Sequence, residues 1–371
     1  MADGTEVSFF AFFTMVSWVI VPTFALVTLV NLFSARTIRP ITGTQVAESV
    51  AVLLPLRNEA ANCDSLLSSL LAQEGLINLS ITALNDHSHD QTKEKLAAVS
   101  DPRFGYFDGA ELPSEWLGKN FACHQLSQST GADYLVFVDA DVRLHTRAIS
   151  SSIAAMKEFH WDYLSPYPRQ IAITWLERLI QPLLQWSWFV SVPLRFAERF
   201  PRPSMAVANG QFFIVRNEAY KKCGGHEAVK SEVLDDLELA RALIRTGARG
   251  VVADGSRIAH CRMYESAREV IRGYSKSQWR AFGSIMGAIL MIIVLLASSI
   301  VPVIAGALGS PWGWIGFFTI VTTRLAVAAK THSVLSSSWL HPFSALAWIT
   351  LIIFSWIQKS RGTLVWKERS L

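Results

Sequence analysis

The chain has 371 residues, of which 51% are hydrophobic and 13 are tryptophan, and its formal net charge is +4. This composition is too apolar for an ordinary soluble enzyme, and tryptophan is enriched where proteins meet membrane interfaces. The small net charge and the lack of a basic stretch interleaved with aromatic residues argue against nucleic-acid binding. The four cysteines have neither C-x-x-C nor metal-site spacing.

The first predicted element is an apolar segment near the N-terminus. Residues 8–33 carry no charge, and this run is longer than the ~20 residues needed to cross a bilayer. A cleaved signal peptide is the alternative, but it would begin with basic residues, whereas Asp3 and Glu6 precede this segment. We therefore expect a retained transmembrane anchor within residues 1–40.

Further apolar segments lie in the C-terminal third. Residues 281–323 are uncharged but broken by the turn-like sequence GSPWGW at 309–314, and residues 331–358 form the last segment. The run 312–323, which ends at Arg324, is short of the ~20 residues of a span. We therefore expect it to be re-entrant or interfacial. The alternative is a true span in which Arg324 reaches an interface or faces another helix.

Charges beside these segments predict the orientation of the chain. Arg36 and Arg39 follow the anchor directly, so the next domain should lie on the cytoplasmic face of the plasma membrane. The basic C-terminal tail should be cytoplasmic for the same reason, which is why one C-terminal segment is expected not to cross. The expected parts are an anchor (1–40), a globular domain (48–280), membrane segments (281–358) and a basic tail (359–371).

The globular domain alternates predicted strands and helices. SVAVLLPLRNE at 49–59 and LSITALNDHSHDQT at 79–92 each read as a buried strand that ends in a polar turn before a helix. Residues 104–108 and 134–138 predict further strands. This alternation predicts a doubly wound, mainly parallel α/β sheet that binds ligands at the carboxyl ends of its strands. The glycine motifs of dinucleotide-binding and P-loop proteins are missing from the sequence.

The strand at 134–138 ends in two carboxylates, Asp139 and Asp141. Burying ionised carboxylates is costly unless a cation compensates. Two oxygen donors at the edge of the sheet suit a hard divalent cation such as Mg²⁺ or Mn²⁺. The alternative is a turn with helix-capping aspartates.

Several motifs, taken together, resemble family 2 glycosyltransferases, which are inverting enzymes with the GT-A fold. In chain order they are LLPLRNE, NDHSHDQT, WLGKNFA, VFVDADV, NGQFFIVR with YKKCGGHEAV, and VLDDLELARAL. The resemblance covers residues 48–280. ELPSEWLGKNFACHQ, CRMY with GYSKS, and VWKER are similar to the membrane enzymes of carotenoid and hopanoid pathways, with ceramide glucosyltransferases more distant.

This resemblance implies a nucleotide-sugar donor and residues that bind it. Pro55, Arg57 and Glu59 would lie beside the base and ribose. Asp86 would hydrogen-bond uracil, which implies a UDP-linked donor. Lys119 would meet the nucleotide or its diphosphate, as a point charge against phosphate.

The resemblance also implies the metal ligands and the catalytic base. Asp139 and Asp141 would hold Mg²⁺ or Mn²⁺ beside the donor, with Asp141 the more direct ligand. Asp236 would be the general base, and Asp235 stands where the family has Glu; Asn85 replaces the first Asp of the family's D-D. Inverting transfer independently requires a base for the acceptor and a charge to stabilise the leaving diphosphate. The alternative for Asp235 and Asp236 is that they only begin a helix, because acidic side chains are favoured at helix starts.

The acceptor is expected to be a membrane lipid such as a carotenoid, hopanoid or sphingolipid-like molecule. Residues 170–196 are rich in Trp and Leu, and we expect an interfacial amphipathic helix there, with a core or re-entrant segment as the alternative. A processive polysaccharide synthase would carry Q-x-x-R-W, but Gln278, Trp279 and Arg280 have the wrong order and spacing. A non-catalytic scaffold that retains the fold is the third possibility.

Overall fold

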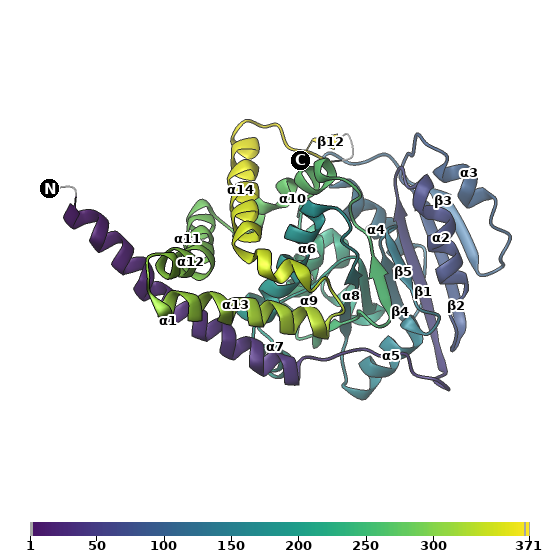
Figure 1. Ribbon diagram of the computed structural model, residues 1–371. Helices are drawn as coiled ribbons and strands as arrows, with labels where there is room; N and C mark the ends of the chain where they lie inside the picture. Colours follow the sequence, from purple (N-terminus) through teal and green to yellow (C-terminus); the bar gives the residue numbers. More distant parts are fainter. Residues whose placement is uncertain (1–2, 367–368, 371) are drawn as a thin grey trace. The chain divides into compact units, whose positions relative to one another are not determined.

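The structure is a computed structural model that describes residues 3–366 and 369–370. Its contacts divide the chain into two compact units (Figure 1). The sheet unit contains residues 35–171 and 194–263, and the helical unit contains residues 1–34, 172–193 and 264–371. Two segments expected in the globular domain, 172–193 and 264–280, therefore group with the apolar helices. Of the expected basic tail, residues 367, 368 and 371 lie outside the described residues.

A seven-stranded sheet with the order β3-β2-β1-β4-β8-β6-β9 forms the centre of the sheet unit. β8 is antiparallel to β4 and β6, and the other neighbours are parallel. The expected mainly parallel α/β sheet is confirmed. The strands are β1 (Val46–Leu56), β2 (Leu76–Asn85), β3 (Phe104–Asp108), β4 (Tyr134–Val138), β6 (Tyr163–Tyr167), β8 (Phe212–Arg216) and β9 (Gly250–Asp254).

Helices cover both faces of this sheet because alternate residues of each central strand point to opposite sides. On β1, Val52 and Leu54 join one hydrophobic cluster with Leu66, whereas Leu53 joins another with Leu126. The helices are α2 (Ala60–Leu71), α3 (Thr92–Ala97), α4 (Gly118–Gln128), α5 (Ala148–Glu158), α7 (Leu194–Arg199), α8 (Asn217–Lys222) and α9 (Asp235–Arg245). Short 3₁₀ turns are η1 (Pro203–Met205) and η2 (Gly225–Val229), and a second sheet contains β5 (Val142–Leu144), β7 (Arg169–Gln170) and β10 (Ala259–Cys261). With both faces covered, a ligand reaches this sheet at its strand ends.

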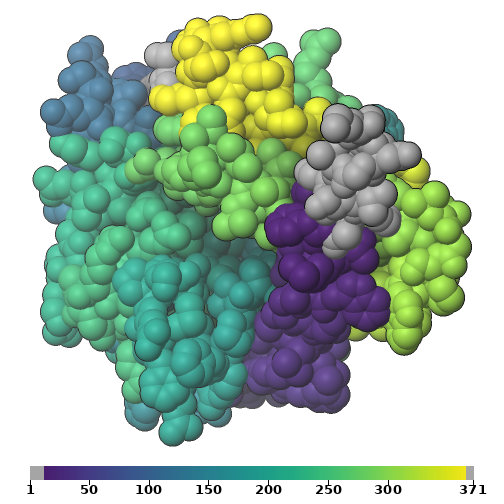
Figure 2. Space-filling model, turned by 90° about the vertical axis from the view of Figure 1, so that its left-hand side faces the viewer, coloured from purple at the N-terminus to yellow at the C-terminus, as the bar shows by residue number. Residues whose placement is uncertain are grey.

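The helical unit contains the apolar segments. Its elements are α1 (Asp3–Ser34), α6 (Trp175–Ser191), α10 (Ala267–Ala281), α11 (Ile285–Leu295), η3 (Leu296–Ile300), α12 (Val301–Ala307), α13 (Pro311–Lys330), η4 (Ser336–Leu340) and α14 (His341–Ser360), with short strands β11 (Val365–Trp366) and β12 (Arg369–Ser370). Four stretches in the described chain are long and apolar enough to cross a membrane: Phe12–Ser34, Ile285–Ala307, Pro311–Lys330 and Ser336–Ser360. The side chains of residues 12–34 of α1, purple in Figure 2, lie largely on the surface.

The expectation that residues 312–323 are too short to span rested on a wrong helix end. α13 continues through Arg324 to Lys330, so it has 20 residues. Arg324 is 2% exposed, and its Nη1 lies 3.2 Å from Nδ1 of His341 on α14. The helix therefore continues through this arginine, whose side chain faces another helix. Whether α13 crosses a membrane stays a prediction.

The expectation of an interfacial helix at 170–196 is also wrong. α6 is buried on most of its surface by the other helices of its unit. Trp186 Nε1 donates a hydrogen bond to Thr323 Oγ1 of α13, and Asn31 Nδ2 of α1 donates to the Phe189 carbonyl oxygen. Glu177 does not mark a solvated face, since its carboxylate accepts hydrogen bonds from Ile173 N and Thr174 Oγ1 at the helix start. α6 is a core helix of the helical unit.

Candidate active site

The predicted site residues of the sheet unit follow strands that end at the same edge. β1, β2 and β4 are adjacent and parallel, so the turns that begin at Arg57, Asp86 and Asp139 all lie at their carboxyl ends. β8 runs the opposite way, which places residues 209–211, just before its first residue, at that same edge. The topology therefore assembles this site from four strands.

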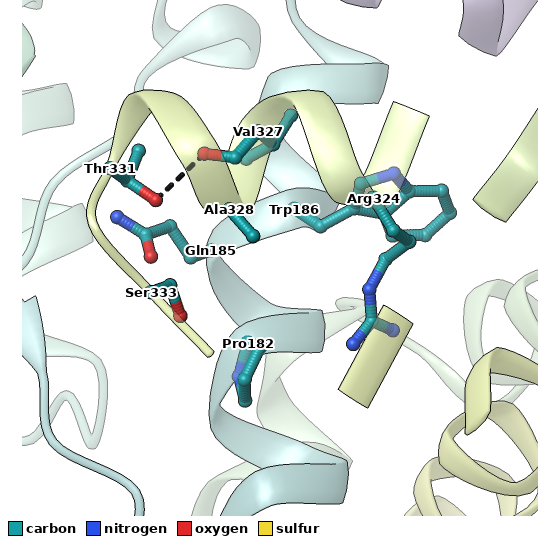
Figure 3. Close-up of a pocket in the computed structure, with 8 residues that line it drawn as sticks. All are labelled: Pro182, Gln185, Trp186, Arg324, Val327, Ala328, Thr331 and Ser333. Carbon is teal, nitrogen blue, oxygen red and sulfur yellow. Dashed lines mark hydrogen bonds between the residues drawn. The ribbon is translucent and has the colours of Figure 1, made fainter. Parts of the chain in front are cut away.

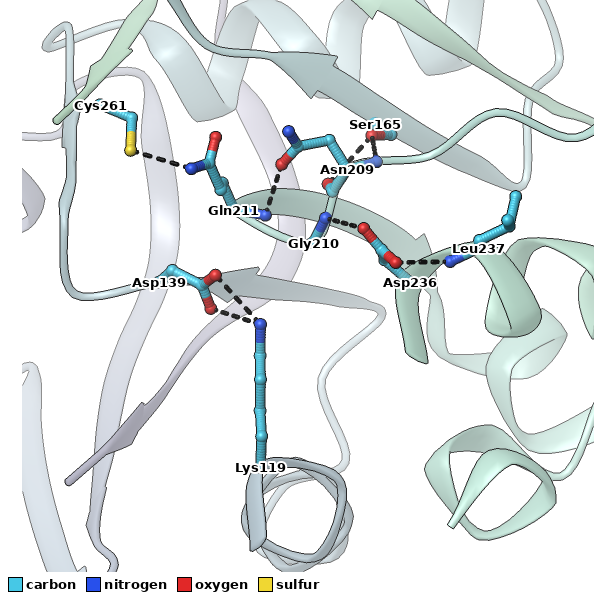
Figure 4. Close-up of polar contacts among 9 residues, drawn as sticks. All are labelled: Lys119, Asp139, Ser165, Asn209, Gly210, Gln211, Asp236, Leu237 and Cys261. Carbon is cyan, nitrogen blue, oxygen red and sulfur yellow. Dashed lines mark hydrogen bonds and ion pairs between the residues drawn. The ribbon is translucent and has the colours of Figure 1, made fainter. Parts of the chain in front are cut away.

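Lys119 and Asp139 form an ion pair at this edge (Figure 4). The Lys119 Nζ atom is 2.7 Å from Oδ1 and 3.0 Å from Oδ2 of Asp139. Burial alone would lower the pKa of Lys119, but the carboxylates of Asp139 and Asp235 outweigh it and hold the pKa well above its usual value. The lysine side chain keeps 37% of its surface exposed. It is therefore a permanent positive charge within reach of a ligand.

Asp141 lies two residues farther on and is poorly satisfied by the protein. Its Oδ1 atom is buried and has no hydrogen-bond partner among the described residues. Burial, with a contribution from the Asp139 charge, raises the pKa of Asp141 to about 6. A buried carboxylate oxygen without a donor beside a second carboxylate fits an oxygen-coordinated divalent cation.

The protein alone offers this cation few ligands. The described part of the chain has no group of three or more His, Cys, Asp or Glu side chains arranged to hold a metal. A cation bound to Asp139 and Asp141 would therefore complete its coordination with oxygens from a substrate and water. Such a site suits a metal that arrives with a diphosphate, since Mg²⁺ is usually bound through one or two carboxylates plus substrate phosphates.

Asp236 lies in the first turn of α9 and faces the same edge. Its Oδ2 accepts a 2.7 Å hydrogen bond from Gly210 N, and its Oδ1 accepts a 2.8 Å bond from Leu237 N. Burial, followed by the charge of Asp235, raises the pKa of Asp236 to about 6. The helix-start interpretation is correct for its position, but a carboxyl group with this pKa is also suited to general-base catalysis near neutral pH.

Gly210 is the point where these groups meet. A Cβ atom at Gly210 would be 3.2 Å from Asp236 Cβ and 3.5 Å from Lys119 Nζ. The residue therefore has to be small, and the charged pair and the buried carboxyl lie on either side of it. Gly210 lies in the NGQFFIVR motif of the family resemblance, but it was not among the predicted catalytic, metal-binding or donor-binding residues.

Hydrogen bonds hold the loop around Gly210 in place (Figure 4). Asn209 N donates to Ser165 Oγ, and Gln211 N donates to Asn209 Oδ1, both at 2.8 Å. The Gln211 carbonyl oxygen accepts a 3.0 Å bond from Asp139 N. The loop thus connects the main chain of Asp139 to the side chain of Asp236. The sequence signal is the NGQ triplet immediately before a buried strand.

The residues expected to bind the nucleotide lie on the two neighbouring turns. Arg57 Nη1 donates a 2.9 Å hydrogen bond to the Asp86 carbonyl oxygen, and Glu59 Oε2 accepts from Asn62 Nδ2. Asn85, which replaces the family's aspartate, donates through Nδ2 to Asp108 Oδ1 at the end of β3. Pro55 lies within β1. The structure brings these turns together, and their contacts with a nucleotide stay predictions.

A mainly parallel sheet of this topology, with acids and a lysine at its carboxyl edge, has the architecture of a GT-A glycosyltransferase. Residues 51–224 match the sequence model of the family described as glycosyl transferase family 2. The chain therefore carries a family 2 glycosyltransferase domain and is a glycosyltransferase. This confirms the family resemblance drawn from its motifs.

The chain is similar to two 4,4'-diaponeurosporenoate glycosyltransferases. It is 25% identical to that of Staphylococcus haemolyticus over 256 residues, which cover 68% of this chain and 66% of the relative. It is 23% identical to that of Staphylococcus aureus over 335 residues, which cover 87% and 88% of the two chains.

Among solved structures, the chain is similar to a mannosyltransferase from Pyrobaculum calidifontis in complex with GDP-Man and Mn²⁺. The TM-score is 0.56 at 14% identity, over 98% of this chain and 99% of that chain. At this identity the likeness shows a shared fold.

Proposed function

We propose that this glycosyltransferase moves a single sugar, with inversion, from a nucleoside diphosphate sugar to a membrane lipid. The observation that carries the proposal is the convergence of Lys119, Asp139 and Asp236 around Gly210. One carboxyl group with a raised pKa and one permanent cation are what a single in-line displacement at the anomeric carbon requires. The match of Asp86 to the uracil-binding position supports a UDP-linked donor.

In this mechanism Asp236 removes the proton of an acceptor hydroxyl while the hydroxyl oxygen attacks the anomeric carbon. Lys119 stabilises the charge that develops on the departing diphosphate. Asp139 and Asp141 would hold Mg²⁺ or Mn²⁺, which when bound supplies Lewis-acid stabilisation of the diphosphate oxygens. Lys119, which pairs with Asp139 in this structure, would contact the phosphate when Asp139 holds the cation.

The four apolar stretches and the similarity to carotenoid glycosyltransferases support a lipid acceptor. The relatives' name specifies a carboxylate, the anion of a carboxylic acid. An acceptor hydroxyl needs a base, whereas a carboxylate is already ionised at neutral pH. Dependence on Asp236 therefore distinguishes a hydroxyl acceptor from a carboxylate acceptor.

The first experiment identifies the product. Membranes that contain the protein are incubated with a panel of labelled nucleotide sugars, and lipid products are identified by mass spectrometry. We expect one sugar per lipid. A polymer would instead support the processive synthase, and the lack of any lipid-linked product from every donor would contradict the proposal.

The second experiment tests the base. With a hydroxyl-bearing lipid as acceptor, Asp236→Asn should lower turnover by ~10²–10⁴-fold, the usual contribution of a general base. Its affinity for nucleoside diphosphate should be unchanged. Glu218→Gln removes an exposed acid on α8 and is the control. If Asp236→Asn chiefly weakens nucleotide binding, the base is another residue, and Asp235 is then the first to test.

A further inference from the structure

The helical unit contains a buried arginine that has no anionic partner among the described residues. Arg324 is 2% exposed, and its one described polar contact is the 3.2 Å approach of Nη1 to His341 Nδ1. Its Nη2 atom is buried and has no partner among the described residues. A guanidinium group keeps its charge in proteins, and a buried charge without a counter-ion is costly. Such residues within apolar helices commonly mark functional sites.

Other unsatisfied polar groups line the pocket beside this arginine (Figure 3). Both amide atoms of Gln185 and the Ser333 hydroxyl are buried and have no hydrogen-bond partner among the described residues. Figure 3 shows Gln185 extending toward Thr331 and Ser333, with Arg324 at the other end of the lining. The lining contains no carboxylate. It therefore offers several hydrogen-bond donors and one positive charge, which is the chemistry of an oxyanion site.

The pocket is closed in this structure and does not admit a water-sized molecule. Its empty space of about 180 Å³ includes open solvent, and its lining comes from α6, α13 and the segment that follows α13. The space is narrow, so an entering group requires Arg324 or Gln185 to change rotamer. The hydrocarbon part of a bound amphiphile would remain outside the pocket.

The pocket lies near the end of α13 that adjoins the end of α1. Lys330, the last residue of α13, donates a 2.9 Å hydrogen bond from Nζ to the Leu32 carbonyl oxygen. Arg324 is six residues earlier, which corresponds to ~9 Å along a helix. Because Arg36 and Arg39 predict that α1 ends at the cytoplasmic face, this depth corresponds to the inner leaflet.

We propose that this Arg324 pocket binds the oxyanion head group, a carboxylate or a phosphate, of a membrane amphiphile from the inner leaflet. After the rotamer change of Arg324 or Gln185, the anion would pair with the Arg324 guanidinium and accept a hydrogen bond from the Gln185 amide. Two sources share this chemistry: a free lipid acid, and an anionic phospholipid. Binding at this site does not depend on the sugar-transfer reaction proposed above.

The test measures lipid binding to the full-length protein in neutral detergent by native mass spectrometry. Oleate is compared with oleyl alcohol, and phosphatidylglycerol with phosphatidylcholine. We expect the wild type to prefer at least one anion over its neutral counterpart by ~10-fold or more, as for hydrogen bonds to charged groups. Arg324→Gln should abolish this preference. Arg272→Gln removes an exposed arginine from α10 of the same unit and should retain it.

The two pairs of probes identify the source of the anion. A preference limited to oleate indicates a free lipid acid, and a preference for phosphatidylglycerol indicates a leaflet phospholipid. Gln185→Leu keeps the charge and should weaken the preference several-fold, which tests the pocket even if Arg324→Gln does not fold. Equal binding of charged and neutral probes by the wild type would overturn the proposal. So would a preference that survives both pocket substitutions.

Discussion

At the scale of single residues, burial raises the pKa of two aspartates that have different proposed roles. The pKa values of Asp141 and Asp236 are both raised to about 6, chiefly by burial and secondly by a neighbouring aspartate. Asp141 has an oxygen without a hydrogen-bond partner in the described chain, so a cation would restore its charge. Asp236 instead accepts two backbone hydrogen bonds and stays available to a proton.

The pH dependence of transfer to a hydroxyl acceptor should report Asp236. The base works when ionised, so activity should rise as the pH increases through about 6, the pKa to which its surroundings raise it. Asp235→Asn removes a negative charge that raises this pKa, so the rising limb should move to lower pH. The measurement is kcat/KM against pH for both proteins. If the rising limb does not move in Asp235→Asn, the limb reports the titration of a group other than Asp236.

Metal removal should separate the roles of the two acid pairs. We expect excess chelator to abolish transfer and Mg²⁺ or Mn²⁺ to restore it, because a cation is needed to neutralise the diphosphate. Asp141→Asn should weaken donor binding as well as turnover, whereas Asp236→Asn should affect turnover alone. Isothermal titration with donor and metal measures this difference. Full activity in excess chelator would refute the metal assignment.

At the scale of elements, the loop before β8 links the parts of the site that come from different elements. β4 supplies Asp139 and α9 supplies Asp236, and residues 209–211 bond to both. The antiparallel direction of β8 is essential here, because it brings the start of this strand to the edge where its neighbours end. The same loop is anchored to Ser165 at the centre of β6.

Gly210→Ala tests this loop. The added Cβ would lie 3.2 Å from Asp236 Cβ, so the carboxyl group must shift by a few tenths of an ångström. We expect turnover to fall by at least ~10-fold, with little change in thermal stability, since misplacement of ~1 Å can cost ~10²-fold. Gly131→Ala adds the same methyl group where nothing lies within 4 Å and is the control. Equal activity of both variants would show that Gly210 does not position Asp236.

At the scale of the whole molecule, the helical unit indicates which C-terminal helix does not cross the membrane, so that the basic tail can lie in the cytosol. Trp279 N of α10 donates to Ser355 Oγ near the end of α14, and Lys359 Nζ lies 4.3 Å from the centroid of the Trp279 ring. α14 also runs across the direction of α13 (Figure 1). α10 lies almost wholly within residues 48–280, which are expected in the cytosol. We therefore predict that α14, and not α13, stays on the cytoplasmic side, which leaves the basic tail in the cytosol as the positive-inside rule requires.

Single cysteines in a background without the native four test this topology. The positions are Leu308, before α13, Leu335, after it, and a residue added after Leu371. In intact cells an impermeant thiol reagent should label Leu308→Cys alone, and permeabilisation should expose all three. Labelling of the tail would show that α14 crosses. An unlabelled Leu308→Cys would show that the segment before α13 does not reach the outside.

The sequence alone determined the fold class and the identity of most candidate site residues. Buried strands that end in carboxylates have a local signature, because hydrophobic runs and charged turns are properties of neighbouring residues. Asp139, Asp141 and Asp236 could be found in this way and through the family resemblance. Their order along the chain, however, contains no information about which of them meet.

Tertiary structure decided the contacts between distant segments. Gly210 becomes important because two side chains from α4 and α9 approach it. The NGQ triplet marks a turn before a buried strand, but it does not say which distant side chains meet there. α6 resembled an interfacial helix because its aromatic residues could face lipid or protein equally well. In the structure they face protein, because α6 packs against α1, α13 and α14. Arg324 shortened the predicted span because a charge usually interrupts an apolar segment. In the structure its guanidinium lies inside the protein beside His341 of another helix, a contact that neighbouring residues in the sequence do not reveal.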